Sequence, residues 1–331
     1  MSTSSLKQRI APELARIEAA IEADLTWLGD HIDPYLHEII CYGMRGGGKR
    51  IRPLLVVLCG RLCGQLHGCA EDDLYRLAIA FEYLHNATLF HDDVIDRAET
   101  RRGRPAIWRQ FGMAAAILAG DFLHSHSMNL LGQLTGKDGM AIFSAASRKM
   151  SDGEFLQLRR AGHFHSGREE YFFIVEGKTA HLIAACCAVG ALFAGAEPDK
   201  INSLKEYGLR LGLTFQIVDD MLDYAGDSAI TGKKTGVDLA EGKMTLPLIV
   251  LLEQADDPEE IRTLLAAQDD GRKFATITEQ MRRHDTLAAC REISRQTRDA
   301  GLAALTPFTA VGGDSLEILY SLAFFVTDRQ N

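Results

Sequence analysis

The sequence predicts an all-α protein that folds as one large domain. Apolar residues recur every three or four positions along most of the 331 residues, which is the spacing of a helix. Strand signals are scarce, because β-branched runs such as residues 248–250 sit within helix-compatible sequence and no hairpin with a tight Asn-Gly turn is present. No Pro- or Ser-rich linker divides the chain. We therefore expect a single domain over residues 1–331.

The helical pattern can be followed in chain order. It begins with residues 6–28, and residues 54–66 are apolar almost all round, as expected of a buried helix. The further segments with helical spacing are residues 73–96, 114–134, 141–160, 169–194, 200–224 and 246–254. Helical patterns with charged faces then continue to Asp328.

Composition excludes several classes of protein. A net charge of −9 and a pI near 5.7 leave no basic excess for nucleic acid. No stretch reaches the roughly 18 uninterrupted apolar residues of a membrane span, and residues 1–13 lack a signal-peptide core. The seven cysteines show no zinc-ribbon spacing and are typical of reduced, mostly buried thiols. We expect a cytoplasmic protein with no transmembrane segment and no nucleic-acid partner.

Two aspartate clusters with the same DDxxD spacing are the strongest functional signal. They are Asp92, Asp93 and Asp96 in the first cluster, and Asp219, Asp220 and Asp223 in the second. In a helix, the first and last aspartate of each cluster lie one turn apart on one face, where like charges repel. Carboxylate oxygens suit Mg²⁺, which completes its shell with water and substrate phosphate. The pattern predicts two carboxylate walls that grip a diphosphate through magnesium.

A glycine loop with basic residues precedes the buried segment at 54–66. Residues 46–48 are all glycine, and Lys49, Arg50, Ile51, Arg52 and Pro53 follow them. Pro53 fits the first turn of a helix, where its missing N–H costs nothing. Lys49 and Arg52 therefore stand at a helix amino terminus, a place that favours an anion.

These motifs, in this order, resemble those of the trans-isoprenyl diphosphate synthases, the polyprenyl synthetase family. The resemblance covers nearly the full length and rests on GGGKRIRP, HNATLFHDDVIDRAETRRG, AGDFL, EGKTAHL, FQIVDDMLD and GKKTGVDLAEGKMTLPLI. It implies an all-helical bundle of the isoprenoid synthase type around a deep central cavity, usually in a homodimer. It also implies head-to-tail condensation of isopentenyl diphosphate with an allylic diphosphate such as farnesyl diphosphate, with three Mg²⁺ ions bound alongside the allylic substrate.

The resemblance also implies roles for single residues. The six aspartates match magnesium ligands, and Lys49, Arg52, His85 and Arg102 match the residues that bind isopentenyl diphosphate. Residues at the allylic diphosphate are matched by Arg101, Lys233 and Lys243, and those beside the reacting carbons by Lys178, Thr179 and Gln216. Hydroxyl and amide dipoles there would stabilise an allylic cation. The released diphosphate is expected to take the proton, so no side chain is assigned to that step.

Small residues below the first aspartate cluster favour a long product. Ala87 and Thr88 lie five and four residues before Asp92, where an aromatic residue would resemble the floor of a farnesyl-length enzyme. We expect a medium- or long-chain product, octaprenyl or longer, for a quinone side chain. Phe81 is either a stop for the growing chain or only part of the core. Met128 replaces a phenylalanine of several octaprenyl-type members and is less obstructive.

Other functions stay open. A short-chain farnesyl or geranylgeranyl diphosphate synthase shares all the motifs, whereas a non-catalytic subunit of a heteromer typically loses one aspartate motif. A class I terpene cyclase shares one DDxxD cluster but does not need GGGKRIRP. Two HxH pairs, His124/His126 and His163/His165, raise the question of a transition metal. Residues i and i+2 of a helix face different sides, so we expect packing or surface roles for them.

Overall fold

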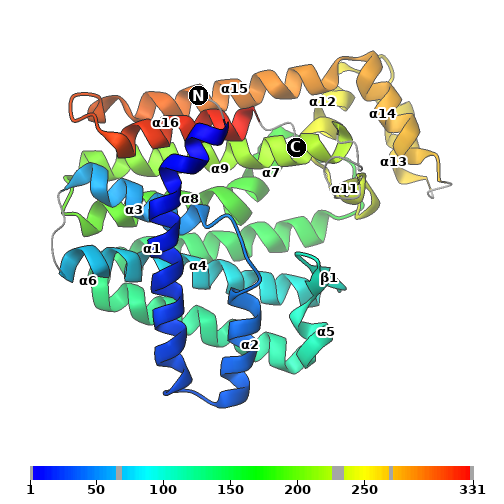
Figure 1. Ribbon diagram of the computed structural model, residues 1–331. Helices are drawn as coiled ribbons and strands as arrows, with labels where there is room; N and C mark the ends of the chain where they lie inside the picture. The colour runs from blue at the N-terminus through cyan, green and yellow to red at the C-terminus, as the bar shows by residue number, and fades with distance from the viewer. Residues whose placement is uncertain (1–2, 65–68, 226–234, 268–270, 329–331) are drawn as a thin grey trace. The chain divides into compact units, whose positions relative to one another are not determined.

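The protein is helical throughout almost all of the described chain, which confirms the predicted all-α class (Figure 1). The computed structural model describes residues 3–64, 69–225, 235–267 and 271–328. The chain divides into two compact units. Unit 1 comprises residues 1–143, 186–204 and 310–319, and unit 2 comprises residues 144–185, 205–309 and 320–331. That the two units act as one domain stays a prediction.

Unit 1 is built around the N-terminal helices. Its complete elements are α1 (Thr3–Gly29), α2 (Pro34–Met44), α3 (Ile51–Cys63), α4 (Cys69–Ile95), β1 (Thr100–Arg101), β2 (Arg104–Pro105) and α5 (Ile107–Phe111). Four helices begin or end in this unit and continue into the other: α6 (Met113–Arg160), α8 (His181–Phe193), α9 (Pro198–Ala225) and α16 (Asp314–Thr327).

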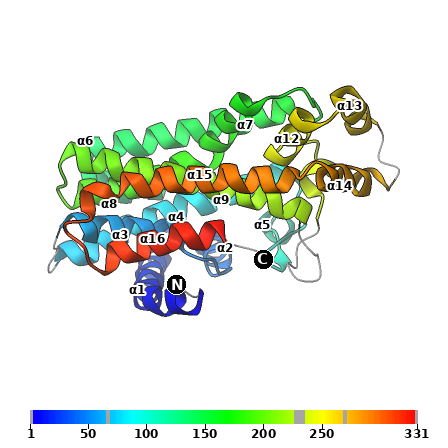
Figure 2. The same cartoon turned by 90° about the horizontal axis from the view of Figure 1, so that it is seen from above.

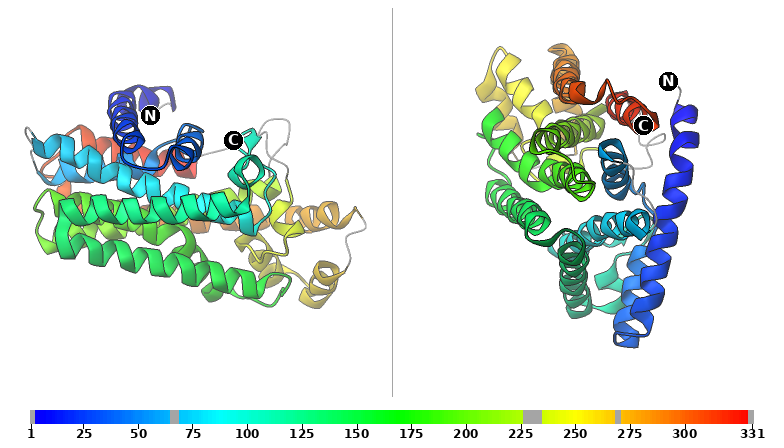
Figure 3. Two further views of the ribbon diagram at one scale, coloured as in Figure 1. Left: turned by 90° about the horizontal axis from the view of Figure 1, so that it is seen from below. Right: turned by 90° about the vertical axis from the view of Figure 1, so that its left-hand side faces the viewer.

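Helix α3 is largely buried within unit 1. It packs against α4 and α1, and α1 runs alongside α2 and α4 (Figure 3). Every residue from Pro53 to Gly60 is buried, which confirms the predicted buried helix as far as α3 extends, whereas residues 65 and 66 of the predicted segment lie outside the described residues. Each buried leucine or valine of this kind contributes about 1.5–3 kcal/mol to folding. A Cβ on Gly190 of α8 would lie only 2.3 Å from the carbonyl oxygen of Val56, so glycine allows the backbones of α8 and α3 to touch.

One prediction about local structure is confirmed and another needs correction. Residues 114–134 and 141–160 are predicted as separate helices, and α6 (Met113–Arg160) indeed consists of two helical stretches joined at Gly136, whose φ of 59° and ψ of −149° are not helical. The chain also contains a short hairpin, in which Thr100 pairs with Pro105 and Arg101 with Arg104. Its turn is Arg102-Gly103, and both φ angles are positive, as in a type I′ turn. Because arginine rather than asparagine precedes the glycine, the usual hairpin signal was absent.

Unit 2 has its own core. Its complete elements are α7 (Arg168–Val175), the π-helical segment η1 (Glu176–Ala180), α11 (Val237–Ala240), α12 (Leu246–Gln254), α13 (Pro258–Ala266), α14 (Lys273–Arg283), α15 (Thr286–Ala304) and the 3₁₀ turn η2 (Thr306–Phe308). Figure 2 shows α13 and α14 gathered beside α12 at one end of α15. Seven residues of α12 are buried, and they join the apolar faces of the neighbouring helices.

The predicted absence of a membrane span needs one qualification. Residues Arg168–Phe193 form one run of helix that is long and apolar enough to cross a bilayer, but 67% of its most apolar window is buried within the protein, as in an ordinary core helix. The six described cysteines are free and mostly buried, as predicted.

Candidate active site

Helix α4 carries the first aspartate cluster at its C-terminal end. Asp92 and Asp93 lie in the last turn of α4, and Asp96 directly follows it. The backbone N–H of Asp96 donates a 2.8 Å hydrogen bond to the carbonyl oxygen of Asp92, so the two residues lie one helical turn apart, as predicted. Asp92 is partly exposed and Asp96 exposed, whereas Asp93 is buried. The three aspartates therefore do not have equivalent surroundings.

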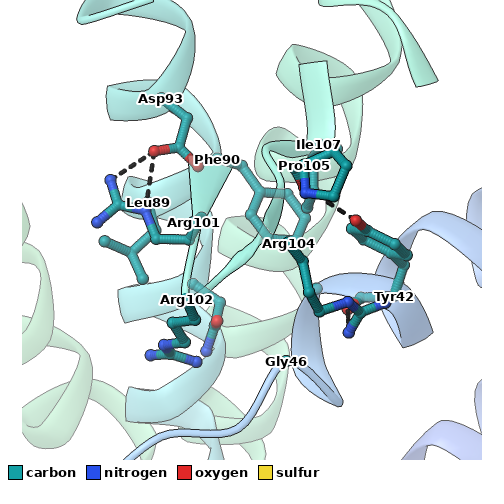
Figure 4. Close-up of a pocket in the computed structure, with 12 residues that line it drawn as sticks. Tyr42, Gly46, Leu89, Phe90, Asp93, Arg101, Arg102, Arg104, Pro105 and Ile107 are labelled. Carbon is teal, nitrogen blue, oxygen red and sulfur yellow. Dashed lines mark hydrogen bonds and ion pairs between the residues drawn. The ribbon is translucent and has the colours of Figure 1, made fainter. Parts of the chain in front are cut away.

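Asp93 is held by Arg101 from the hairpin. The Nε of Arg101 donates to Oδ1 of Asp93 at 2.9 Å, and Nη2 contacts the same oxygen. Figure 4 shows this pair above Arg102, and the same pocket is lined by Gly46. Asp93 is only 3% exposed, so its charge is compensated by a protein partner. The structure thus joins two residues to which separate roles were assigned, and their roles as metal ligand and diphosphate contact stay predictions.

The charges of several arginines act on His85, which lies two turns before Asp92 on α4. Arg102 donates through Nη1 to the carbonyl oxygen of Gly47, and a Cβ on Gly48 would lie 3.2 Å from its Nη2. The glycines therefore let the arginine lie close to the loop. Arg52, in the first turn of α3, has a buried Nε with no hydrogen-bond partner in the described chain. A buried N–H of this kind is costly unless a ligand satisfies it.

The electrostatics of this cluster favour an anion. Burial and the charges of Arg52 and Arg102 hold the pKa of His85 well below its usual value. Burial also lowers the pKa of Arg52, and the charge of Glu82 opposes that effect. The pKa of Arg102 is lowered by burial as well, and by Arg50 among its neighbours. These cations lie close enough to disfavour one another, and a bound diphosphate would relieve that repulsion.

Helix α9 carries the second aspartate cluster, and a chain of hydrogen bonds connects it to η1. Thr179 donates to the side-chain oxygen of Gln216 at 3.1 Å, and the Gln216 amide donates to Oδ1 of Asp220 at 2.8 Å. Tyr171 of α7 donates to the other oxygen of Asp220 at 2.7 Å. The structure therefore brings Thr179 and Gln216 together, as their predicted shared role requires.

The three aspartates of α9 also differ from one another. Burial raises the pKa of Asp220 to about 8, with the charge of Asp238 adding to the effect and the bonds from Gln216 and Tyr171 opposing it. Asp223 accepts backbone N–H bonds from Val237 at 3.2 Å and Asp238 at 3.0 Å. Asp219 is partly exposed. Metal binding by each of them stays a prediction.

The π-helical segment η1 presents Lys178 and Thr179. Its backbone comes very close to α6, because a Cβ on Gly177 would lie 2.6 Å from the carbonyl oxygen of Lys149. A Cβ on Gly153 would lie 2.9 Å from the backbone nitrogen of Lys178. Single π turns within helices occur frequently at functional sites. Two glycines that face each other thus set the position of the lysine and the threonine.

Both described lysines of unit 2 that were assigned to the site have acidic partners. Lys178 forms a 2.7 Å ion pair with Glu154 of α6. Lys243 pairs with Glu241 and lies 3.6 Å from Asp238. Lys233 lies outside the described residues. Lys49, at the glycine loop, is exposed.

Several residues that contact the site were missed in the sequence. They are Arg50, Glu82, Tyr171, Glu154 and Asp238. Arg50 lies within the basic motif and Asp238 within TGVDLA, but neither spacing reveals a partner. The other three lie in helices whose apolar spacing predicts which face is buried but not which polar side chains meet.

Four residues bear on the predicted product length, of which Phe81, Ala87 and Thr88 lie in α4 and Met128 in α6. Phe81 is completely buried, and its ring centroid lies 5.8 Å from that of Phe143. Ala87 is buried and Thr88 donates to the carbonyl oxygen of His85. Met128 is 38% exposed. Whether Phe81 stops the chain stays a prediction.

The two HxH pairs lie in different surroundings, because His124 and His126 belong to α6 whereas His163 and His165 lie between α6 and α7, outside any helix. His126 packs between aromatic rings and bonds to Asp24 at 2.8 Å, and His124 stacks near Phe143. Among described residues, no group of three or more His, Cys, Asp or Glu side chains is arranged to hold a metal by itself.

Comparison with known proteins identifies the family. Residues 33–281 match the family model of the polyprenyl synthetases. Octaprenyl diphosphate synthase of Escherichia coli K12 is 32% identical over 307 residues, which cover 92% of this chain and 93% of that protein. Geranylgeranyl diphosphate synthase of Saccharolobus solfataricus is 32% identical over 305 residues, which cover 89% and 90%.

A solved structure agrees over the whole length. The polyprenyl synthase of Caulobacter crescentus CB15, crystallised with calcium and isoprenyl diphosphate, superposes with a TM-score of 0.86 and is 33% identical, covering all of this chain and 98% of that one. The predicted isoprenoid synthase fold and the predicted prenyltransferase activity are thereby confirmed. The chain belongs to the polyprenyl synthetase family, the prenyltransferases that condense isopentenyl diphosphate onto allylic diphosphates.

Proposed function

We propose that this chain is a Mg²⁺-dependent trans-polyprenyl diphosphate synthase that extends an allylic primer such as farnesyl diphosphate to a medium or long product. One observation carries the proposal. The charges of Arg52 and Arg102 act on the buried His85, which lies on the helix whose end carries Asp92 and Asp96. One helix thus connects a group of cations with a pair of carboxylates. The cations suit a diphosphate that binds directly to the protein, and the carboxylates suit one that binds through magnesium.

The carboxylates fit magnesium by their chemistry. Asp92 and Asp96 offer oxygen donors one turn apart, and Asp219 offers another from α9. Mg²⁺ takes few protein ligands and keeps water and phosphate oxygens, which agrees with the lack of a closed ligand cage in the described chain. When bound, magnesium would neutralise charge on the leaving diphosphate as its C–O bond breaks. Members of the family generally depend on this ion, and three ions are proposed here.

The other residues of the clusters have supporting roles in this proposal. Asp93 orients Arg101 toward the allylic diphosphate, because Oδ1 of Asp93 accepts a hydrogen bond from Nε of Arg101. Asp220 fixes the side-chain amide of Gln216, and the amide oxygen of Gln216 accepts a hydrogen bond from the hydroxyl of Thr179. The oxygen atoms of Thr179 and Gln216 would stabilise positive charge on the allylic carbons without attacking them. Lys178, Lys233 and Lys243 would contact the allylic diphosphate.

Isopentenyl diphosphate would bind at the start of α3 without metal. Arg52 and Arg102 supply forked donors for phosphate oxygens, and Lys49 supplies a point charge. His85 would act as a neutral donor, because its pKa lies well below its usual value. The cation formed when the two substrates join would then lose a proton, and the released diphosphate would accept it.

Product length, assembly and location also belong to the proposal. Small Ala87 and Thr88 support a long product, as does the likeness to an octaprenyl diphosphate synthase. The equally similar geranylgeranyl diphosphate synthase supports the shorter alternative. We further propose a homodimer in the cytoplasm.

The test is an assay of purified protein with Mg²⁺, labelled isopentenyl diphosphate and farnesyl diphosphate, followed by chromatography against chain-length standards. Incorporation of label into products longer than farnesyl diphosphate is expected. No incorporation with farnesyl, geranyl or dimethylallyl primers would refute the synthase function. A geranylgeranyl product would overturn the long-chain proposal alone.

A further inference from the structure

We propose that Arg50 is a positioning residue for the isopentenyl diphosphate site, and that it holds the start of α3 in place against three other helices. The inference rests on the proposed function, which assigns that site to isopentenyl diphosphate. Arg50 lies between Lys49 and Arg52 in the sequence, yet its own side chain faces the protein interior and is only 3% exposed.

Arg50 gathers acceptors from α1, α2 and α4. Its Nε donates to Glu18 at 2.7 Å, and its Nη1 donates to Glu82 at 2.7 Å. Its Nη2 donates to the carbonyl oxygen of Met44 at 2.8 Å and to Glu18 at 3.4 Å. All three guanidinium nitrogens are therefore engaged by the protein, so Arg50 is not itself a diphosphate ligand.

The backbone of Arg50 sets the direction in which α3 begins. Its φ of 48° and ψ of 34° place it in the left-handed region at the N-cap of α3, an unfavourable conformation for a residue with a Cβ. Its side chain makes no capping bond to the helix. The bonds to Glu18, Glu82 and Met44 are what hold this residue in that conformation. Since Lys49 precedes it and Arg52 is two residues further on, their positions depend on it.

Glu82 connects this anchor to the other half of the site. It is 3% exposed and lies one turn before His85 on α4, and its carbonyl oxygen accepts the Asn86 amide at 2.8 Å. Its charge also acts on Arg52 and Arg102 and opposes the lowering of their pKa values.

Pairing with Arg50 has a consequence for the substrate. A buried carboxylate is stable only when a cation compensates its charge, and the cations on which the charge of Glu82 also acts are Arg52 and Arg102. Without Arg50, either would be drawn from the diphosphate toward the protein. Arg50 thus keeps those two arginines available for the anion in addition to fixing the helix start.

The test compares Arg50→Met and Arg50→Lys with the wild-type enzyme. We expect Arg50→Met to raise the KM for isopentenyl diphosphate about tenfold or more, equivalent to ~1.4 kcal/mol, while the KM for farnesyl diphosphate changes less than about twofold. Arg50→Lys should recover part of the loss, since it keeps the charge but reaches fewer acceptors. An unchanged KM for isopentenyl diphosphate in Arg50→Met, with only a lower Tm, would overturn the proposal.

Arg45→Met is the matched control. Arg45 makes a similar two-pronged contact from the end of α2 to Glu22 of α1, through Nε at 3.1 Å and Nη2 at 2.8 Å, but both partners are about half exposed. It should leave both KM values unchanged. An equal rise in KM in this control would show that any weakened contact between α1 and α2 suffices, and would refute a specific role for Arg50.

Two further measurements keep the inference testable. If Arg50→Met does not fold, Glu18→Gln weakens the anchor from its half-exposed side, and an unchanged KM for isopentenyl diphosphate there refutes the inference. Binding of inorganic diphosphate by calorimetry separates this inference from the synthase function. An inactive wild-type protein would refute the function, whereas equal dissociation constants for wild type and Arg50→Met would refute the positioning role.

Discussion

Gly177→Ala tests how the π-helical segment positions the residues beside the reacting carbons. The added Cβ would lie 2.6 Å from the carbonyl oxygen of Lys149 and 3.0 Å from the Cα of Gly153. Ordinary contact begins near 3.4 Å, so η1 and α6 must separate by about 0.8 Å. The obstacle is backbone, which cannot swing aside as a flexible side chain can.

The expected cost in stability is small because two effects oppose each other. Overpacking of a close contact costs about 1–3 kcal/mol, whereas alanine is favoured over glycine within a helix by about 1 kcal/mol. The net destabilisation is therefore about 0–2 kcal/mol. Lys178 and Thr179 directly follow the altered residue and shift with it, and a misplacement of this order costs about 10²-fold in rate. Activity should fall far more than stability.

The assay measures kcat with isopentenyl and farnesyl diphosphates, together with thermal unfolding by circular dichroism. Gly132→Ala in α6 is the control, because its Cβ would lie 3.6 Å from Sδ of Met140, an ordinary contact. That variant should keep wild-type kcat with an unchanged or slightly higher Tm. If Gly177→Ala behaves in the same way, the close contact does not position the site and the reasoning is wrong.

Three further predictions address the metal, the product and pH. Asp92→Ala or Asp219→Ala should lower kcat by about 10²–10³-fold with unchanged far-UV circular dichroism, and normal activity in either would contradict the metal hypothesis. Phe81→Leu should lengthen the product on chromatography if Phe81 stops the chain, whereas an unchanged product with a lower Tm would assign it to the core. The pKa of His85 is lower in the folded than in the unfolded chain, so below about pH 6.5 the unfolded chain binds a proton that the folded chain does not. The free energy of unfolding therefore decreases as the pH is lowered. When the pH is lowered from about 7.5 to 5.5, the free energy of unfolding from urea titrations should therefore decrease less for His85→Asn than for wild type. An equal decrease would contradict the lowered pKa of His85.

Much of the fold could be predicted because helical spacing is a local signal. The burial of α3 and the one-turn spacing of Asp92 and Asp96 follow from residues close together in the chain. The break at Gly136 was expected only as a gap between two helices, since a positive φ does not show in an apolar pattern. The hairpin at Arg102-Gly103 was missed because its turn lacks the usual asparagine.

The site was harder to predict where residues distant in sequence act on one another. Arg50 looks like another cation of a basic loop, and only its partners Glu18 and Glu82, each 32 residues away, distinguish it from Lys49 and Arg52. Asp93 belongs to a cluster of carboxylates, and its burial against Arg101 depends on a hairpin that the pattern did not predict. Spacing alone identified which residues gather, but not which of them contact a ligand.

The Glu18–Arg50 pair bears on how short a working version of this enzyme can be. The family match begins at residue 33, after α1 has ended. A chain trimmed to that boundary retains Lys49, Arg52 and His85, yet removes the Glu18 carboxylate that accepts from two nitrogens of Arg50. Such a fragment would contain the residues that match the family model but would lack the Glu18 carboxylate that holds Arg50. If Arg50 positions the isopentenyl diphosphate site as proposed, we expect a chain without the first helix to bind isopentenyl diphosphate more weakly than the full chain.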